Sequence, residues 1–155
     1  MEANEVKKDA KTAIADLLQA QYDNAFKDKE AGKPIGWATS VFPQELAEAF
    51  DLQLLYPENH AAGVAAKRES LELCELSEAQ GYSNDLCAYA RTNFGVLIKG
   101  HSDALPMPEP DFLCCCNNIC GEVVKWYENI SRELNIPLIM IETPYNFDDE
   151  ISEER

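Results

Sequence analysis

The sequence has no apolar run long enough to cross a membrane. A membrane-spanning helix needs about 20 consecutive apolar residues, and no stretch of this 155-residue chain approaches that length. The amino terminus, MEANEVKKDAKTAIADLL, is charged and lacks the apolar core of a signal peptide. We therefore expect a cytoplasmic protein that has no membrane partner.

Basic residues are also scarce. The chain has 13 Lys and Arg against 28 Asp and Glu, which gives a formal net charge of −15. Proteins that bind nucleic acid do so through clustered basic side chains. The charge balance therefore argues against nucleic acid as a partner, and high solubility is its simplest consequence.

Histidine is rarer still, because only His60 and His101 are present. A cysteine–histidine enzyme needs a histidine positioned as a base beside its thiol, so this class of enzyme is disfavoured. The six cysteines also lack the two-residue spacing of zinc knuckles and ferredoxins. In a cytoplasmic protein, cysteines are more often free, metal-bound or catalytic than paired in disulfides.

Short apolar stretches alternate with helical ones along the chain. Strands that are apolar throughout and separated by helices are typical of a parallel sheet. We therefore expect an α/β fold, with a parallel sheet and helices on both faces in a Rossmann or flavodoxin-like arrangement. The predicted helices span about 2–30, 43–50, 64–79, 86–98 and 121–134, and the predicted strands span 35–41, 52–56, 112–116 and 136–142.

The chain divides into three expected parts. Residues 1–33 form an amino-terminal helical segment, residues 34–147 an α/β domain and residues 148–155 a charged tail. No helix is predicted after the last strand, so we expect the chain to be part of a longer polypeptide or a tight complex. The first helix is predicted to be amphipathic, with apolar residues at helical spacing, namely Ala13, Ile14, Leu17, Leu18 and Tyr22.

Cys87 and Cys120 share a context that the other cysteines lack. Each follows a polar turn (SND or NNI) and stands at the start of a predicted helix. The positive end of a helix dipole favours negatively charged groups, so two such helix starts can supply thiolates to one soft metal centre. A reactive thiol is the alternative. Of the remaining cysteines, Cys74, Cys114 and Cys115 are predicted to fill the core, and Cys116 is ambiguous.

Two polar residues near predicted strand ends are candidates for chemistry. Glu58, in the predicted loop YPENH, is the best candidate for a general acid or base. A solvated carboxylate without a role is the alternative. Ser40, at the end of the first predicted strand, either binds a substrate carbonyl or caps the following helix.

Four motifs occur in order along the chain: GWATSVFPQELAEAF, LLYPENHAA, NDLCAYARTNFG and CCCNNICGEVVKWYENISRELNIP. Together they cover about Ile35 to Tyr145. They closely resemble the 2-hydroxyacyl-CoA dehydratase and benzoyl-CoA reductase family, in particular the D-component of 2-hydroxyglutaryl-CoA dehydratase. The resemblance implies an oxygen-sensitive enzyme of two related subunits, each carrying an iron–sulfur cluster, normally [4Fe-4S].

The resemblance also implies which residues hold the cluster. Cys87 and Cys120 match two of the three cluster-binding cysteines of a family subunit, which makes residues 34–147 a cluster-binding domain. The third cysteine belongs to a carboxyl-terminal domain that this sequence does not contain. We therefore expect an amino-terminal fragment or one piece of a split subunit. The implied partners are a second dehydratase subunit or the missing domain, and an ATP-dependent activator protein that donates the electron.

The chemistry implied by the resemblance is the removal of water from an (R)-2-hydroxyacyl-CoA. One electron converts the thioester carbonyl into a ketyl radical, which expels the α-hydroxyl. Ser40 matches a serine near the substrate carbonyl, and Glu58 matches a glutamate proposed for proton transfer. Asn59 and His60 match the substrate pocket. Both Ser40 and Glu58 are present, which favours the substrate-binding subunit. The alternatives are a benzoyl-CoA reductase-type subunit and a degenerate, non-catalytic assembly domain.

Overall fold

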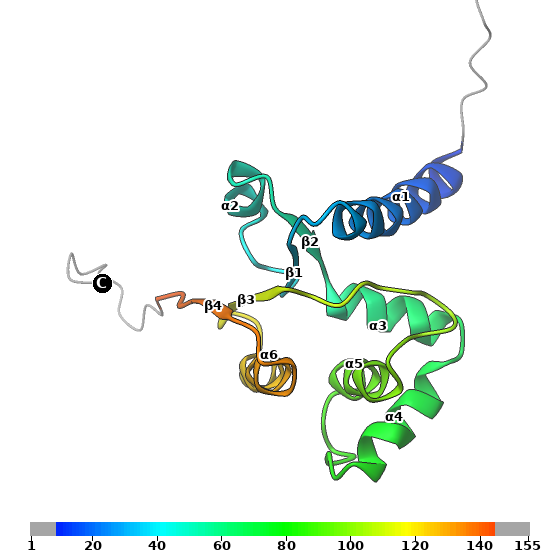
Figure 1. The fold of residues 1–155 in the computed structure, drawn as a ribbon. Helices are drawn as coiled ribbons and strands as arrows, with labels where there is room; N and C mark the ends of the chain where they lie inside the picture. The colour runs from blue at the N-terminus through cyan, green and yellow to red at the C-terminus, as the bar shows by residue number, and fades with distance from the viewer. Residues whose placement is uncertain (1–8, 145–155) are drawn as a thin grey trace, which may run out of the picture.

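The computed structural model describes residues 9–144 of the chain (Figure 1). The predicted tail at 148–155 and the predicted helical residues before residue 9 lie outside this range. No helix within the described range is both long and apolar enough to cross a membrane. The elements are, in order, α1 (Ala10–Glu30), β1 (Ile35–Ala38), α2 (Gln44–Ala49), β2 (Gln53–Leu55), α3 (Pro57–Ala66), α4 (Ser70–Ala79), α5 (Ala88–Lys99), β3 (Phe112–Cys116), α6 (Gly121–Leu134) and β4 (Leu138–Ile141).

The four strands form one sheet in the order β2-β1-β3-β4, and every pair of neighbours is parallel. On β1, Ile35 lies opposite Gln53 of β2, and Gly36 lies opposite Phe112 of β3. The predicted parallel α/β sheet is confirmed. The chain turns from β1 to β2 on one side and crosses to β3 on the other. Doubly wound sheets bind ligands at such a switch point, outside the carboxyl ends of the strands.

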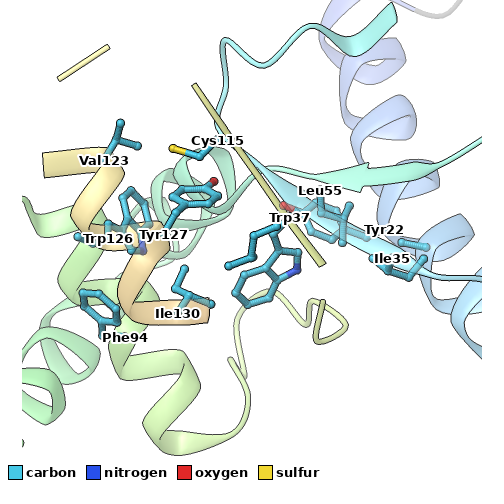
Figure 2. Packing of buried hydrophobic residues seen from close by; sticks show 13 residues of the cluster. Tyr22, Ile35, Trp37, Leu55, Phe94, Cys115, Val123, Trp126, Tyr127 and Ile130 are labelled. Carbon is cyan, nitrogen blue, oxygen red and sulfur yellow. The ribbon is translucent and has the colours of Figure 1, made fainter. Parts of the chain in front are cut away.

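Side chains of the strands alternate between two faces of the sheet. On one face Trp37 and Cys115 join the main core, which the helices α1, α5 and α6 also build (Figure 2). On the other face Ala38, Cys114 and Cys116 pack against the short helix α2 and residues near it. Cys114 and Cys115 thus fill the core from opposite faces, as predicted.

The segment after β2 differs from the prediction. The prediction of a loop at YPENH is wrong, because α3 begins at Pro57. Proline is readily accepted in the first turn of a helix. The prediction of a single helix over 64–79 is also wrong. It is divided between α3 and α4, and Arg68 takes a left-handed conformation (φ 69°) in the turn that separates them.

Helix α1 forms as predicted, but the described residues cover only the later part of its apolar stripe. Tyr22 and Ala25 are buried in the main core. Earlier in the helix, Ile14 is 58% exposed, Leu17 71% and Leu18 50%. The helix therefore packs on the domain through its second half, while its first half projects away from the sheet (Figure 1).

Helices α4 and α5 approach each other closely at Gly95. A Cβ atom placed on this glycine would lie 2.1 Å from the carbonyl oxygen of Leu73 on α4. Val64, Leu73 and Val96 form a second small core beneath α3, α4 and α5. Cys74 is buried in this helical layer, at 7% exposure, which confirms its predicted packing role. The layer fixes where α5 begins, and hence where Cys87 lies.

Candidate functional site

The polar residues singled out in the sequence follow the carboxyl ends of the strands. Ser40 lies just past β1, Glu58 lies in the first turn of α3 after β2, and Cys120 is the residue before α6. Thr39 ties β1 to β3 at the switch point. Its N–H donates to the carbonyl of Cys114 at 3.0 Å, and its Oγ1 accepts the N–H of Cys116 at 3.2 Å. The switch point is thus a rigid base for the residues that follow it.

Both carboxylate oxygens of Glu58 accept hydrogen bonds. The backbone N–H of Ser40 donates to Oε1 at 3.1 Å, and the hydroxyl of Tyr127 donates to Oε2 at 3.2 Å. The carboxylate also lies at the amino terminus of α3, where the helix dipole stabilises negative charge. The structure thus brings Ser40 and Glu58 into direct contact and adds Tyr127 as a third member of the group.

The hydroxyl of Ser40 is not engaged by the part of the chain between residues 9 and 144. Ser40 is exposed, and its only hydrogen bond in this range uses the backbone N–H. The following helix, α2, is preceded by Pro43 and has no side-chain cap. Helix capping within the described residues therefore does not account for this serine.

Asn59 and His60 lie apart from this group. Asn59 is exposed and lines two cavities, of about 490 and 290 Å³, beside β2 and α1. His60 is fully buried, and its Nε2 lies 2.7 Å from the carbonyl oxygen of Leu105. Burial lowers the pKa of His60, so the ring is neutral and anchors the loop after α5 to α3. A role for either residue in substrate binding stays a prediction.

Cys87 and Cys120 occupy equivalent places on two helices. Each is the capping residue immediately before its helix, α5 or α6, and each is exposed with no side-chain cap hydrogen bond. The backbone N–H of Cys87 donates to Oε1 of Glu122 at 2.7 Å. Because Glu122 lies in the first turn of α6, this contact tethers the start of α5 to the start of α6. Both thiols therefore face solvent from adjoining helix starts.

The remaining four cysteines are buried. Burial raises the pKa of Cys114 to about 11 and that of Cys115 to about 12, with a smaller contribution from the neighbouring Cys116. Cys116 itself is only 2% exposed, and burial raises its pKa as well. No cluster of three or more His, Cys, Asp or Glu that could hold a metal ion occurs within residues 9–144. Cys87 and Cys120 are thus the exposed thiols within this range that could contribute to a metal site, and by themselves they do not make a complete ligand set.

Two members of the site were not singled out in the sequence. Tyr127 and Glu122 both belong to α6 and reach residues that are far away along the chain. The sequence contains a feature that could have drawn attention to each. Glu122 is an acidic residue in the first turn of a predicted helix, and Tyr127 follows Cys120 by seven residues. Neither feature indicates which residue the side chain contacts.

Comparison with known proteins settles the family. A family model described as 2-hydroxyglutaryl-CoA dehydratase, D-component, matches residues 39–155. The chain belongs to this family. The (R)-2-hydroxyisocaproyl-CoA dehydratase alpha subunit of Clostridioides difficile is 69% identical over 149 residues, and the (R)-phenyllactyl-CoA dehydratase alpha subunit of Clostridium sporogenes is 47% identical over 148. Each comparison covers 96% of this chain and 36% of the relative.

A reductase is also similar to the chain, at greater distance. One subunit of the benzoyl-CoA reductase of Thauera aromatica is 26% identical over 152 residues, covering 95% of this chain and 35% of that protein. The chain is thus more similar to the two dehydratase alpha subunits than to this reductase subunit. The chain spans about a third of the length of the relatives that it matches.

Proposed function

We propose that this chain supplies the acid–base pair and two cluster ligands of a 2-hydroxyacyl-CoA dehydratase subunit. The single observation that carries the proposal is the contact between Ser40 and Glu58 at the switch point of the sheet. The 69% identity to a dehydratase alpha subunit supports it independently. The domain boundaries 33/34 and 147/148 and the cytoplasmic location belong to the same proposal.

Each residue of the pair has a distinct task. The exposed hydroxyl of Ser40 donates a hydrogen bond to the thioester carbonyl or the α-hydroxyl of the substrate. Glu58 holds or accepts a proton at its carboxylate, which is fixed by two donors and stabilised by the amino terminus of α3. Dehydration requires a proton to leave the β-carbon and the α-hydroxyl to depart. A carboxylate positioned beside a hydroxyl donor can serve both needs.

Cys87 and Cys120 are the proposed cluster ligands of this chain. Their thiols are exposed at adjoining helix starts, and the tether from Glu122 keeps those starts together. A bound [4Fe-4S] cluster would supply the low-potential electron that the reaction needs. The remaining ligation, a second dehydratase subunit and an ATP-dependent activator protein are expected from outside the described residues.

The substrate class follows from the relatives. The names of two relatives specify (R)-2-hydroxyisocaproyl-CoA and (R)-phenyllactyl-CoA, which are both acyl-CoA thioesters with a hydroxyl at the 2-position. We therefore propose an (R)-2-hydroxyacyl-CoA as the substrate, and (R)-2-hydroxyisocaproyl-CoA is the first one to assay.

Anaerobic reconstitution with iron and sulfide, in the presence of the partner subunit, tests the cluster. Cys87→Ala and Cys120→Ala should each lower the iron content and the visible absorption, while Cys74→Ala, at a buried packing position, should not. Iron content that is unchanged in both ligand variants would show that the ligand assignment is wrong. A complex that binds no iron at all would favour the non-catalytic assembly domain.

An activity assay with the activator and ATP tests the reaction. The assembled enzyme should dehydrate (R)-2-hydroxyisocaproyl-CoA. Ser40→Ala and Glu58→Gln should reduce the rate by about a hundredfold or more without loss of iron, since general acid–base groups typically contribute that much. Reduction of benzoyl-CoA in place of dehydration would establish the reductase alternative.

A further inference from the structure

Tyr127 is a buried phenol whose hydroxyl reaches the candidate site. The residue lies in the middle of α6 and is fully buried. It extends from α6 toward Cys115 on β3, with its hydroxyl at the far end (Figure 2). There the hydroxyl donates to Oε2 of Glu58 at 3.2 Å. A buried hydroxyl without a partner would destabilise the fold by about 1–3 kcal/mol, so this contact also satisfies the phenol.

The surroundings of Tyr127 keep it in the donor form. Burial raises its pKa well above the usual 10, and the negative charge of Glu58 and the hydrogen bond to it act in the same direction. The thiol of Cys115, on the same face of the sheet, also raises its pKa, and so does that of Cys114 on the opposite face. The phenol therefore stays protonated throughout the physiological range and donates to Glu58 without exchanging roles.

The two hydrogen bonds of Glu58 come from different parts of the fold. Ser40, after β1, holds Oε1, and Tyr127, on α6, holds Oε2. A carboxylate has about four lone-pair sites, so two sites remain for a substrate proton when both anchors are in place. Without the phenol, Oε2 would lose its anchor and the carboxylate could rotate about its side-chain bonds.

We propose that Tyr127 is a positioning residue for proton transfer, which holds the carboxylate of Glu58 in one orientation beside Ser40. This inference rests on the proposed role of Glu58 in dehydration. It extends the site to a residue that does not touch the substrate and acts only through the carboxylate that it binds.

Nuclear magnetic resonance on the full chain tests the contact without any need for activity. With tyrosine labelled with carbon-13 at Cζ, the signal that disappears in Tyr127→Phe identifies Tyr127. Its titration midpoint should lie well above the usual 10 of a tyrosine, and Glu58→Gln should lower it. Tyr82→Phe is the matched control, because Tyr82 stacks on Phe94 away from the site and should leave the Tyr127 signal in place. A Tyr127 midpoint that Glu58→Gln does not change would overturn the inference.

Kinetics of the assembled enzyme test the purpose of the contact. Tyr127→Phe should lower kcat by about ten- to a hundredfold, since small misplacements of a reacting group have effects of this size. KM should change little, and the pH profile of kcat should shift. In the Glu58→Gln background, Tyr127→Phe should have no further effect on kcat. Tyr82→Phe should leave kcat and KM unchanged.

The outcomes separate the two proposals. If the wild-type enzyme dehydrates its substrate and Glu58→Gln is impaired, an unchanged kcat and pH profile in Tyr127→Phe overturns the positioning role alone. If the wild-type enzyme shows no dehydration, the proposed function fails and the positioning role fails with it, while the magnetic resonance result still decides whether the contact exists. Equal unfolding midpoints of Tyr127→Phe and wild type, measured in urea, show that a kinetic effect is not caused by misfolding.

Discussion

At the scale of single residues, burial divides the six cysteines into two kinds. Cys74 and the three consecutive cysteines of β3 are buried, whereas Cys87 and Cys120 are exposed. Burial raises the pKa of the thiols of β3, and a protonated thiol is a poor nucleophile and a poor metal ligand. We therefore expect the two reactive thiols to be those of Cys87 and Cys120, which we also propose as cluster ligands.

Thiol modification of the native chain should show this division. Under anaerobic conditions and without iron, two thiols per chain should react rapidly with a disulfide reagent such as dithionitrobenzoate, and four should react only after unfolding. The double variant Cys87→Ala/Cys120→Ala should lose the rapid phase, whereas Cys74→Ala should retain it. A rapid phase of three or more thiols would mean that Cys74 or a cysteine of β3 is open to solvent.

The negative charge of Glu69 stabilises the folded state. Its carboxylate accepts hydrogen bonds from the hydroxyl of Ser102 at 2.6 Å and from the N–H groups of Asp103 and Ala104 at 3.0 and 2.9 Å. Burial raises its pKa, but these hydrogen bonds and one from Lys99 outweigh burial and lower the pKa from 4.5 to about 2. The charged form stabilises the folded state above pH 4.5, and this stabilisation is lost as the pH falls from 4.5 towards 2.

Glu69→Gln should therefore weaken the loop between α5 and β3. The free energy of unfolding at neutral pH is expected to fall by about 1–3 kcal/mol, because these partly buried hydrogen bonds lose their charged acceptor. The loss of stability between pH 4.5 and 2 should become shallower in the variant. Urea unfolding at a series of pH values measures both effects. Glu72→Gln is the control, because Glu72 also contacts Lys99 but is 61% exposed, and it should change little.

At the scale of elements, the sequence predicted the helices and strands that are determined by the pattern of nearby residues. The apolar run of β3 and the cysteine-led start of α6 were both predicted at the residues where they occur. The segment after Pro57 was not, because proline ends some elements and begins others. Here the packing of α3 on α5 and α4 favours the helix. The exposure of Leu17 was also unpredictable, since an apolar stripe shows that a face can be buried and not what covers it.

The crossing of α4 and α5 provides a test at this scale. Gly95→Ala should place a methyl group against the backbone of Leu73 and lower the free energy of unfolding by about 1–3 kcal/mol or more. Gly121→Ala is the matched control, since a Cβ there meets no atom within 4 Å and should leave stability unchanged or slightly raised. Urea midpoints compare the two. Equal midpoints would show that α4 and α5 can move apart to accommodate the methyl group without a loss of stability.

At the scale of the whole molecule, the site is a product of topology. Ser40 and Glu58 are 18 residues apart, and Glu58 and Tyr127 are 69 apart. Three strand ends and the parallel sheet bring these residues together, and the crossover from β2 to β3 places β3 and α6 beside β1. The chemical type of each residue could be read in the sequence, but the pairing of Tyr127 with Glu58 could not, because no periodicity connects segments so far apart.

Net charge is the other property of the whole molecule. A formal charge of −15 on 155 residues makes the folded state repel itself at low salt. Raising sodium chloride from a low to a physiological concentration should therefore raise the urea midpoint, since the Debye length falls to about 8 Å. Potassium chloride should act equally, which excludes binding of a specific cation. A lower midpoint with salt would mean that ion pairs such as Lys29–Asp111 outweigh the repulsion.

Helix α6 carries Cys120 immediately before its first residue and Tyr127 seven residues later. Seven residues are nearly two turns, or about 10 Å along the axis, so one helix sets the spacing between the proposed cluster and the group that orients Glu58. A single inserted or deleted residue between them would rotate Tyr127 by about 100° around the helix and withdraw its hydroxyl. Natural variation in the length of α6 should therefore be confined to positions after Tyr127.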